Sequence, residues 1–279
     1  MSYKSILTII TDPALLQPTI AMAAAVSRAN AAHLEVLCLG VDRTQITGFY
    51  PGDGVILLDE TLQQAQADAQ ALHQAARAVL EQDDLRWSLD WGAAQESGIA
   101  GLVSERARYC DLVVLPGPRG KSGNRDADLL IEAALFGGQV PVLLAPAAGL
   151  PAQWGQRVVL AWNQSREAMR ALRAALPLLQ AARSVSVAIV DPQHFGAERS
   201  DPGGALCVML ARHGIRAEVA VLARTLPRVA DILNRHARDT GASLVVMGAY
   251  GHARLREYVL GGATRSMIDA ADVPVFLAH

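Results

Sequence analysis

The sequence contains few aromatic residues and few cysteines. Phe, Trp and Tyr make up 5% of the 279 residues, so Leu, Val, Ile and Ala must supply most of the core. The three cysteines, Cys38, Cys110 and Cys207, lie far apart and form neither a CxxC pair nor a pattern with histidine at metal-ligand spacing. We therefore expect reduced, buried thiols in a cytoplasmic protein, and no metal site.

An excess of positive charge is also lacking. Lys and Arg number 25 and Asp and Glu number 27, which gives a net charge of −2. Binding to nucleic acid or to an anionic membrane is therefore disfavoured. The uncharged stretch from Ser5 to Thr11 is too short to span a bilayer and ends at Asp12 and Pro13. We expect a soluble protein without a secretion signal.

Hydrophobic residues, in contrast, are abundant. They make up 51% of the sequence, and the mean hydropathy is +0.21. This composition argues against disorder and provides enough apolar surface for a large core. The length favours two domains.

The sequence contains an internal repeat. DLVVLPG, from Asp111, resembles SLVVMGA, which begins 132 positions later at Ser243. VPVLLA, from Val140, resembles VPVFLA, which begins 133 positions later at Val273. Because repeats of this length indicate duplicated structural units, the two halves are expected to share one fold.

The two repeats differ in length at one place. The first strand of the second repeat begins 152 positions after the first strand of the first repeat, and the second strands are offset by 151 positions. The third strands, from Leu85 and Ile215, are offset by only 130. About 21 extra residues therefore lie between the second and third strands of the first repeat, where insertions are tolerated. Much of this segment has the periodicity of an amphipathic helix, carried by Leu58, Leu62, Ala65, Ala69, Leu72, Ala76 and Val79.

Strands and helices alternate in both repeats. In the second, we predict strands at 157–162, 184–190, 215–222, 243–247 and 274–278, and helices at about 165–182, 201–213, 226–239 and 263–271. Short, nearly continuous apolar strands are typical of parallel strands covered on both faces. The prediction is an α/β protein of two Rossmann-like domains, each with a five-stranded parallel sheet. The segment from Ala145 to Ala152 marks their boundary, which gives domains 1–148 and 149–279.

A glycine-rich segment follows the fourth strand of the second repeat. Gly248 and Gly251 are separated by two residues, nine more precede Gly261, and Gly262 follows. Glycines at the carboxyl end of a parallel strand let the backbone approach a ligand closely. The amides at the start of the next helix, together with the Thr264 hydroxyl, could hold a phosphate.

This spacing resembles the nucleotide-binding members of the universal stress protein family. Their motif is Gly, two residues, Gly, nine residues, Gly, then Ser or Thr, and here Gly262 stands at the Ser/Thr position. The strand from Val273 resembles the V-P-V strand that closes the family domain, and the resemblance covers residues 155–279. It implies the fold of the adenine nucleotide alpha hydrolases, a role in the stress response and an adenine nucleotide ligand such as ATP or AMP, with Mg²⁺ accompanying ATP. It also implies a homodimer or pairing of the two domains.

The resemblance also implies a set of ligand contacts. Asn163 stands where the family has an acidic residue that contacts the ribose or base, and backbone near Val190 completes the nucleoside site. Trp162, beside them, is interpreted mainly as a core side chain. The candidate binding residues are Ala161, Trp162, Asn163, Val190, Gly248, Tyr250, Gly251, His252, Arg254, Gly261, Gly262, Ala263 and Thr264.

The first repeat lacks these features. Alignment from its closing strand places Asp128 and Leu129 at the two glycines, and an acidic side chain there would repel a phosphate. Thr11 replaces the acidic residue after the first strand. Gly137 and Gly138 fall at a helix end, where we interpret them as a C-cap. The first domain is therefore expected not to bind nucleotide in the usual way of the family.

An enzymatic site is not apparent from the sequence. The P-loop pattern is absent, GxGxxG does not follow any predicted strand, and no catalytic residue is assigned. The leading hypothesis is a nucleotide-binding sensor or regulator with at most weak ATPase activity. Two alternatives stay open, namely an interaction scaffold with vestigial loops, and a hydrolase or transferase that uses the same pocket.

Overall fold

The computed structural model describes residues 2–44, 53–117, 125–146, 149–192, 201–251 and 262–279. Contacts divide the chain into residues 2–140, which we call the N-terminal unit, and residues 141–279, which we call the C-terminal unit. Both units are α/β. The division falls eight residues before the boundary expected from the repeat, and the pairing of one strand accounts for the difference.

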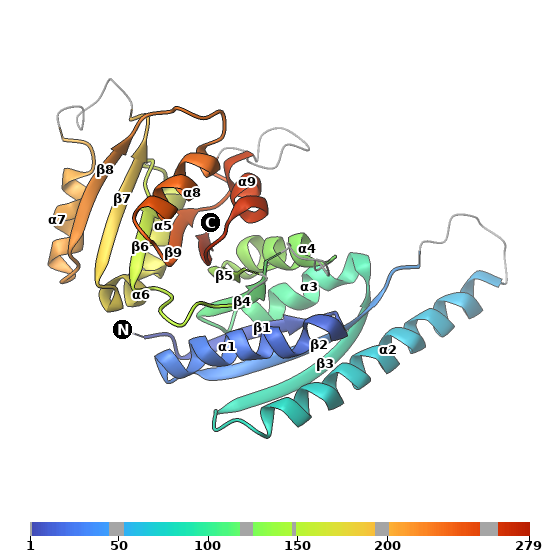
Figure 1. Cartoon of the computed structure of the whole chain (residues 1–279). Coiled ribbons are helices and arrows are strands. Elements are labelled where there is room, and N and C mark those ends of the chain that lie inside the picture. Colours follow the sequence, from blue (N-terminus) through green and yellow to red (C-terminus); the bar gives the residue numbers. More distant parts are fainter. Residues whose placement is uncertain (1, 45–52, 118–124, 147–148, 193–200, 252–261) are drawn as a thin grey trace. The chain divides into compact units, whose positions relative to one another are not determined.

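The N-terminal unit contains a sheet of four parallel strands in the order β3-β2-β1-β4. Helices α1 and α2 cover one face of it, and α3 and α4 lie on the other (Figure 1). The elements are β1 (Ser5–Ile10), η1 (Pro13–Leu15), α1 (Leu16–Asn30), β2 (His33–Asp42), α2 (Asp53–Leu80), β3 (Trp87–Gln95), α3 (Glu96–Ala107), β4 (Leu112–Pro116), α4 (Ala127–Glu132) and η2 (Ala133–Gly138).

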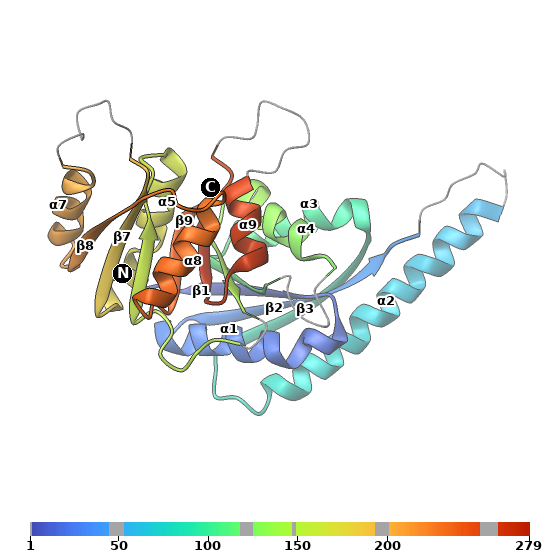
Figure 2. The same cartoon turned by 45° about the horizontal axis from the view of Figure 1, so that its top comes forward.

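The C-terminal unit contains strands in the order β5-β10-β9-β6-β7-β8. Helices α8 and α9 lie side by side against this sheet (Figure 2). The elements are β5 (Val142–Ala145), β6 (Arg157–Ala161), α5 (Arg166–Ala174), α6 (Leu176–Ala181), β7 (Ser184–Val190), α7 (Gly204–Arg212), β8 (Ala217–Leu222), α8 (Val229–Asp239), β9 (Leu244–Gly248), α9 (Gly262–Ala270) and β10 (Val275–Ala278).

Strand β5 ends the first repeat in the sequence but pairs with a strand of the second. It runs antiparallel to β10, with Leu144 opposite Val275 and Val142 opposite Leu277. The other strands of this unit pair in parallel. The closing strands of the two repeats are therefore direct neighbours, which is why the contacts assign β5 to the C-terminal unit.

The extra segment of the first repeat forms α2. This helix of 28 residues stands where the second repeat has α7, with nine. It packs against β2 and β3. The two backbones lie very close at Gly40, where a Cβ would be 1.7 Å from the backbone oxygen of Ala65. Glycine at this position therefore lets the inserted helix lie directly on the sheet.

The helix predicted over 165–182 begins where expected but is divided in two. Ser165 caps α5, because its Oγ accepts a hydrogen bond from the backbone N–H of Ala168 at 3.0 Å. The helix expected over 165–182 is divided into α5 and α6 just before Pro177, whose ring has no N–H to continue the first helix.

The C-cap interpretation of Gly137 and Gly138 is wrong. Both lie within η2, and the residue in the left-handed conformation after it is Gln139, with φ of 56°. A Cβ on Gly137 would lie 2.0 Å from Oγ of Ser104, and one on Gly138 would lie 2.7 Å from Cβ of Ala107. These glycines instead allow η2 to pack closely against α3.

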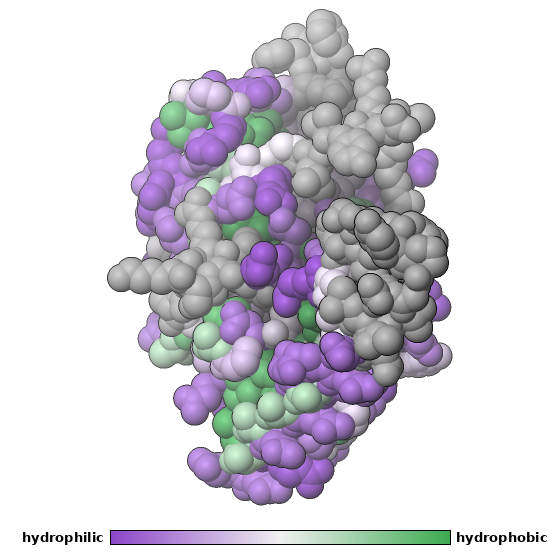
Figure 3. Space-filling model, turned by 90° about the vertical axis from the view of Figure 1, so that its right-hand side faces the viewer, coloured by the Kyte–Doolittle hydropathy of each residue, from purple (hydrophilic) through white to green (hydrophobic). Residues whose placement is uncertain are grey.

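On the face shown in Figure 3, hydrophilic side chains surround small hydrophobic areas. In the part of the chain that the structure describes, no helix is both long and apolar enough to cross a membrane.

Candidate functional site

A cavity of about 330 Å³ lies at the carboxyl ends of the central strands in the C-terminal unit. Its size falls within the range of small-ligand pockets, and its position is where parallel α/β sheets bind ligands. The lining comes from the ends of β6, β7 and β9, from the first turns of α5 and α9, and from one side of α8. The residues are Ala161, Trp162, Asn163, Ser165, Glu167, Ala188, Val190, Val229, Leu233, Met247, Gly248, Gly251, Gly262, Ala263 and Thr264.

Nine of the sequence-predicted contacts line this one cavity: Ala161, Trp162, Asn163, Val190, Gly248, Gly251, Gly262, Ala263 and Thr264. They come from four separate segments of the sequence, which the fold brings together. Tyr250 is not among the lining residues but contacts one of them. His252, Arg254 and Gly261 lie outside the described residues. Binding of a ligand by this set stays a prediction.

Gly248 is required by close packing. A Cβ on it would lie 2.4 Å from the backbone nitrogen of Ala168 and 2.6 Å from the carbonyl carbon of Glu167. These distances are shorter than a side chain can tolerate, so the end of β9 and the first turn of α5 meet at this point through a glycine. The contact fixes one wall of the cavity.

Thr264 connects the glycine-rich segment to α9. The residue is buried, and its Oγ1 accepts a hydrogen bond from the backbone N–H of Tyr250 at 3.0 Å. Tyr250 itself has φ of 58°, a left-handed conformation that non-glycine residues seldom adopt. The bond therefore stabilises a strained turn immediately before Gly251.

Asn163 forms a turn at the end of β6. Its Oδ1 accepts a hydrogen bond from the backbone N–H of Ser165 at 3.2 Å. This leaves the amide nitrogen of the exposed side chain to donate to a ligand. An aspartate here could only accept, so the substitution changes what the site offers to a ribose or base.

Trp162 is both a core side chain and part of the cavity wall. It is 8% exposed, and its backbone N–H donates to the carbonyl of Ala188 at 2.9 Å. Its indole Nε1 is buried and has no hydrogen-bond partner among the residues that the structure describes. The core interpretation therefore describes most of this side chain, while its remaining surface faces the cavity.

The universal stress protein family model matches residues 155–279. Residues 155–279 thus form a domain that matches this family, which we call the universal stress protein domain. Two solved structures resemble the whole chain. A universal stress protein from Archaeoglobus fulgidus DSM 4304 is 17% identical, with a TM-score of 0.67, and the match covers 98% of this chain and 95% of that one. A protein of unknown function from Pseudomonas aeruginosa PAO1 is also 17% identical, with a TM-score of 0.60 and coverage of 99% and 92%.

At these identities the structural likeness shows the fold. A search of curated proteins found no match. The two full-length likenesses extend over the N-terminal unit, which the family model does not match. The α/β architecture of that unit, with its parallel strands, therefore agrees with the fold expected from the repeat.

Several lining residues of the universal stress protein domain were not predicted from the sequence. The apolar ones are Ala188, Val229, Leu233 and Met247. Ala188 was detectable in principle, because it lies two residues before Val190 on the same strand face. Glu167 also lines the cavity, and nothing in the local sequence pattern places its side chain beside the glycines.

A second and larger cavity, of about 800 Å³, lies within the N-terminal unit between α1 and α2. One end of it carries a salt bridge in which Nη2 of Arg43 contacts both carboxyl oxygens of Asp126, at 3.0 and 2.8 Å. Asp126 is buried and directly precedes α4, and Asp128, which the sequence alignment places opposite Gly261, lies in the first turn of that helix. An acidic group of the chain itself thus stands at the helix end where the universal stress protein domain has glycine.

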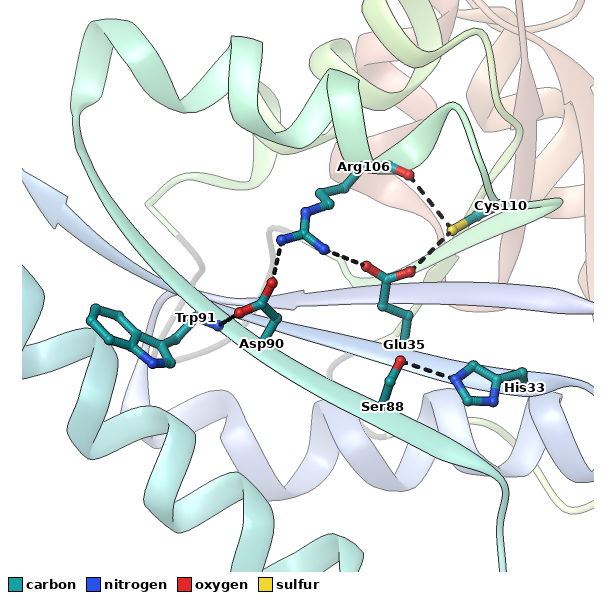
Figure 4. A network of polar contacts seen from close by, with 7 residues as sticks. All are labelled: His33, Glu35, Ser88, Asp90, Trp91, Arg106 and Cys110. Carbon is teal, nitrogen blue, oxygen red and sulfur yellow. Dashed lines mark hydrogen bonds and ion pairs between the residues drawn. The ribbon is translucent and has the colours of Figure 1, made fainter.

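A polar network on β2, β3 and α3 is the other prominent cluster of charged side chains in the N-terminal unit (Figure 4). Arg106 forms ion pairs with Asp90 and Glu35, and Sγ of Cys110 lies 3.9 Å from Oε2 of Glu35. Burial, together with the nearby carboxylates of Glu35 and Asp111, raises the pKa of the Cys110 thiol to about 11. Because the thiolate is the reactive form, this cysteine is protected rather than activated.

Two of the three cysteines are buried, as the sequence interpretation expected, and one is not. All three cysteines are free; Cys38 and Cys110 are buried, whereas Cys207 is half-buried. Burial raises the pKa of Cys38 to about 12. Within the described ranges, no group of three or more His, Cys, Asp or Glu residues could hold a metal ion.

Proposed function

We propose that the C-terminal unit binds an adenine nucleotide, ATP or AMP, and that the protein acts as a nucleotide-responsive regulator in the stress response. The observation that carries the proposal is the convergence of the predicted contacts on one cavity. Family membership of residues 155–279 adds to it. Mg²⁺ would accompany ATP as part of the ligand.

The lining of the cavity contains groups suited to both parts of a nucleotide. Ala188, Val190, Leu233 and Trp162 offer apolar surface to a base. The first backbone amides of α9 and the Thr264 hydroxyl, which belong to the same lining, can hold a phosphate at the positive end of the helix. Asn163 would contact the ribose, to which its side-chain amide nitrogen can donate a hydrogen bond. The lining supplies a binding site, and hydrolysis would be at most slow.

The N-terminal unit is proposed not to bind nucleotide in this way. Its Asp126 places a carboxylate at the start of α4, and Arg43 holds that carboxylate. A phosphate would have to displace this internal ion pair and approach Asp128 in the first turn.

We further propose a cytoplasmic location, because all three cysteines are free thiols. Homodimer formation remains a proposal, whereas pairing of the closing strands already occurs within one chain. Since β5 covers the edge of β10, a homodimer would form through another surface.

Isothermal titration calorimetry with ATP and AMP tests the proposal, using Gly262→Asp and Gly262→Asn as a matched pair. A Cβ at this exposed position meets no atom within 4 Å, so both variants should fold. Asp places a negative charge at the phosphate end of the cavity, and Asn has nearly the same shape without it. We expect at least about tenfold weaker ATP binding for Asp than for Asn. Absence of binding by the unmodified protein, or equal affinities of the pair, would contradict the proposal.

A further inference from the structure

The described lining of the nucleotide cavity contains a single charged side chain, and it is negative. Among the fifteen lining residues only Glu167 is ionisable as an acid or base. The backbone amides of α9 provide the positive end of a helix at the same cavity. A bound phosphate would therefore experience attraction from one wall and repulsion from another.

The carboxylate of Glu167 lies beside the first glycine pair. Glu167 is the second residue of α5 and is half-buried. A Cβ placed on Gly251 would be 3.1 Å from its Oε2. The backbone of Glu167 is held in turn by the close contact with Gly248. Its side chain is thus positioned at the glycine end of the cavity.

Within the described residues, this carboxylate has no hydrogen-bond or ion-pair partner. It contrasts with Asp126 in the N-terminal unit, whose charge is balanced by Arg43. An acidic residue in the first turn of a helix does stabilise the helix modestly. Helix stabilisation can explain why a carboxylate is present at this position. The negative charge would still act on any ligand in the cavity.

The cavity is small enough for the Glu167 charge to act on a phosphate bound anywhere in it. A compact space of about 330 Å³ is only about 9 Å across, which is close to the Debye length at physiological ionic strength. A phosphate inside it would therefore lie within about one Debye length of Glu167, where salt screens the repulsion only in part. The repulsion increases with the number of negative charges on the ligand, whereas the amide positions at α9 are limited in number.

On this basis we propose that Glu167 makes the site select adenine ligands of low negative charge, adenosine and its monophosphate, over free triphosphate. The inference rests on the proposed function, because it concerns the ligand of the same cavity. Mg²⁺ bound to ATP lowers the net charge of the ligand and so reduces the discrimination. Glu167 is a specificity-determining residue in this scheme and performs no chemical step.

The test measures binding of adenosine, AMP and ATP to the full chain, with and without Mg²⁺, for Glu167→Gln and for Glu218→Gln. Gln has nearly the same shape as Glu but lacks the charge, and Glu218 is an exposed residue on β8 outside the cavity. Thermal unfolding of each variant verifies that it is folded.

We expect Glu167→Gln to tighten binding of metal-free ATP about tenfold and binding of AMP about threefold, while adenosine changes by less than about twofold. The gains should shrink at high salt and in the presence of Mg²⁺. Glu218→Gln should bind all three ligands like the unmodified protein.

Three results would overturn the inference: equal changes for all three ligands, weaker ATP binding by Glu167→Gln, or an equal effect of Glu218→Gln. Binding of adenosine without the charge-dependent pattern would refute the role of Glu167 alone. Failure of every adenine ligand to bind would refute the proposed function, and with it this inference.

Discussion

The backbone N–H of Tyr250 donates a hydrogen bond to the side-chain hydroxyl of Thr264, so the turn after β9 is fixed to the first turn of α9. The two residues are fourteen positions apart, and both are buried. One buried side chain therefore links the two ends of the glycine-rich segment.

Replacing Thr264 by Val removes this acceptor and keeps the shape of the side chain. The Tyr250 N–H then loses its buried partner, and we expect a loss of about 1–3 kcal/mol in the free energy of unfolding. Adenine nucleotide binding should weaken as well, because the turn before Gly251 is no longer fixed. Thr264→Ser retains the hydroxyl and serves as the control. Denaturant unfolding and calorimetry measure the two effects, and equal stability of the Val and Ser variants would contradict this role of the bond.

Substitution by alanine should lower the free energy of unfolding at Gly248 but not at Gly262. At Gly248 the new Cβ meets the backbone of α5 at 2.4 Å, so we expect a loss of about 1–3 kcal/mol. At Gly262 it meets nothing within 4 Å, and alanine favours the helix, so stability should stay unchanged or rise slightly. Thermal unfolding compares the pair. Similar shifts for the two variants would show that packing does not distinguish these glycines.

The repeat made much of the fold predictable from the sequence. The sequence predicted the apolar strands, because strands buried on both faces are almost continuously apolar. It also predicted the length difference between the repeats and the extra crossover helix, which has an amphipathic period. The convergence of Asn163, Val190 and Gly248 on one edge was also predictable, since parallel strands end on the same side of a sheet.

Other features depend on contacts between distant segments. The packing role of Gly137 arises from Ser104, on a different helix. The position of Glu167 beside Gly251 depends on how α5 meets the end of β9. No local periodicity encodes either approach, because each is set by the distance between two backbones that are far apart in the sequence.

The salt bridge between Arg43 and Asp126 should stabilise the N-terminal unit. Asp126 is 5% exposed and the Arg43 side chain is 37% exposed, so the interaction is partly screened. We expect Arg43→Met to cost about 1 kcal/mol, because Asp126 then stays buried without this partner. A double-mutant cycle with Asp126→Asn isolates the pair, and the coupling should be about 1 kcal/mol. Strict additivity of the two single changes would mean that the pair contributes nothing.

His236 should make stability depend on pH. Burial lowers the pKa of His236 from its ordinary value of 6.5, while nearby Asp239 opposes the shift. The neutral ring is also hydrogen-bonded to Oγ of Ser186, with 2.8 Å between Nε2 and Oγ. Its contribution is therefore complete above about pH 6.5 and is lost as the pH falls through the lowered pKa, because the unfolded chain takes up the proton more readily.

The measurement is the urea midpoint of the full chain between pH 7.5 and pH 5.5. His236→Gln cannot titrate but can still hydrogen-bond to Ser186, so its midpoint should fall less steeply with decreasing pH. His213→Gln, in which an exposed histidine is replaced, is the control and should follow the unmodified protein. Identical pH profiles for His236→Gln and the unmodified protein would exclude this histidine as the source.

The antiparallel pairing of β5 with β10 occurs between two segments of one continuous chain, which the stretch between Ala145 and Arg157 helps to connect. The pairing is therefore unimolecular. The connecting chain holds β5 near β10 at a fixed effective concentration. The pairing should therefore persist on dilution, whereas the same strands on two separate molecules would dissociate.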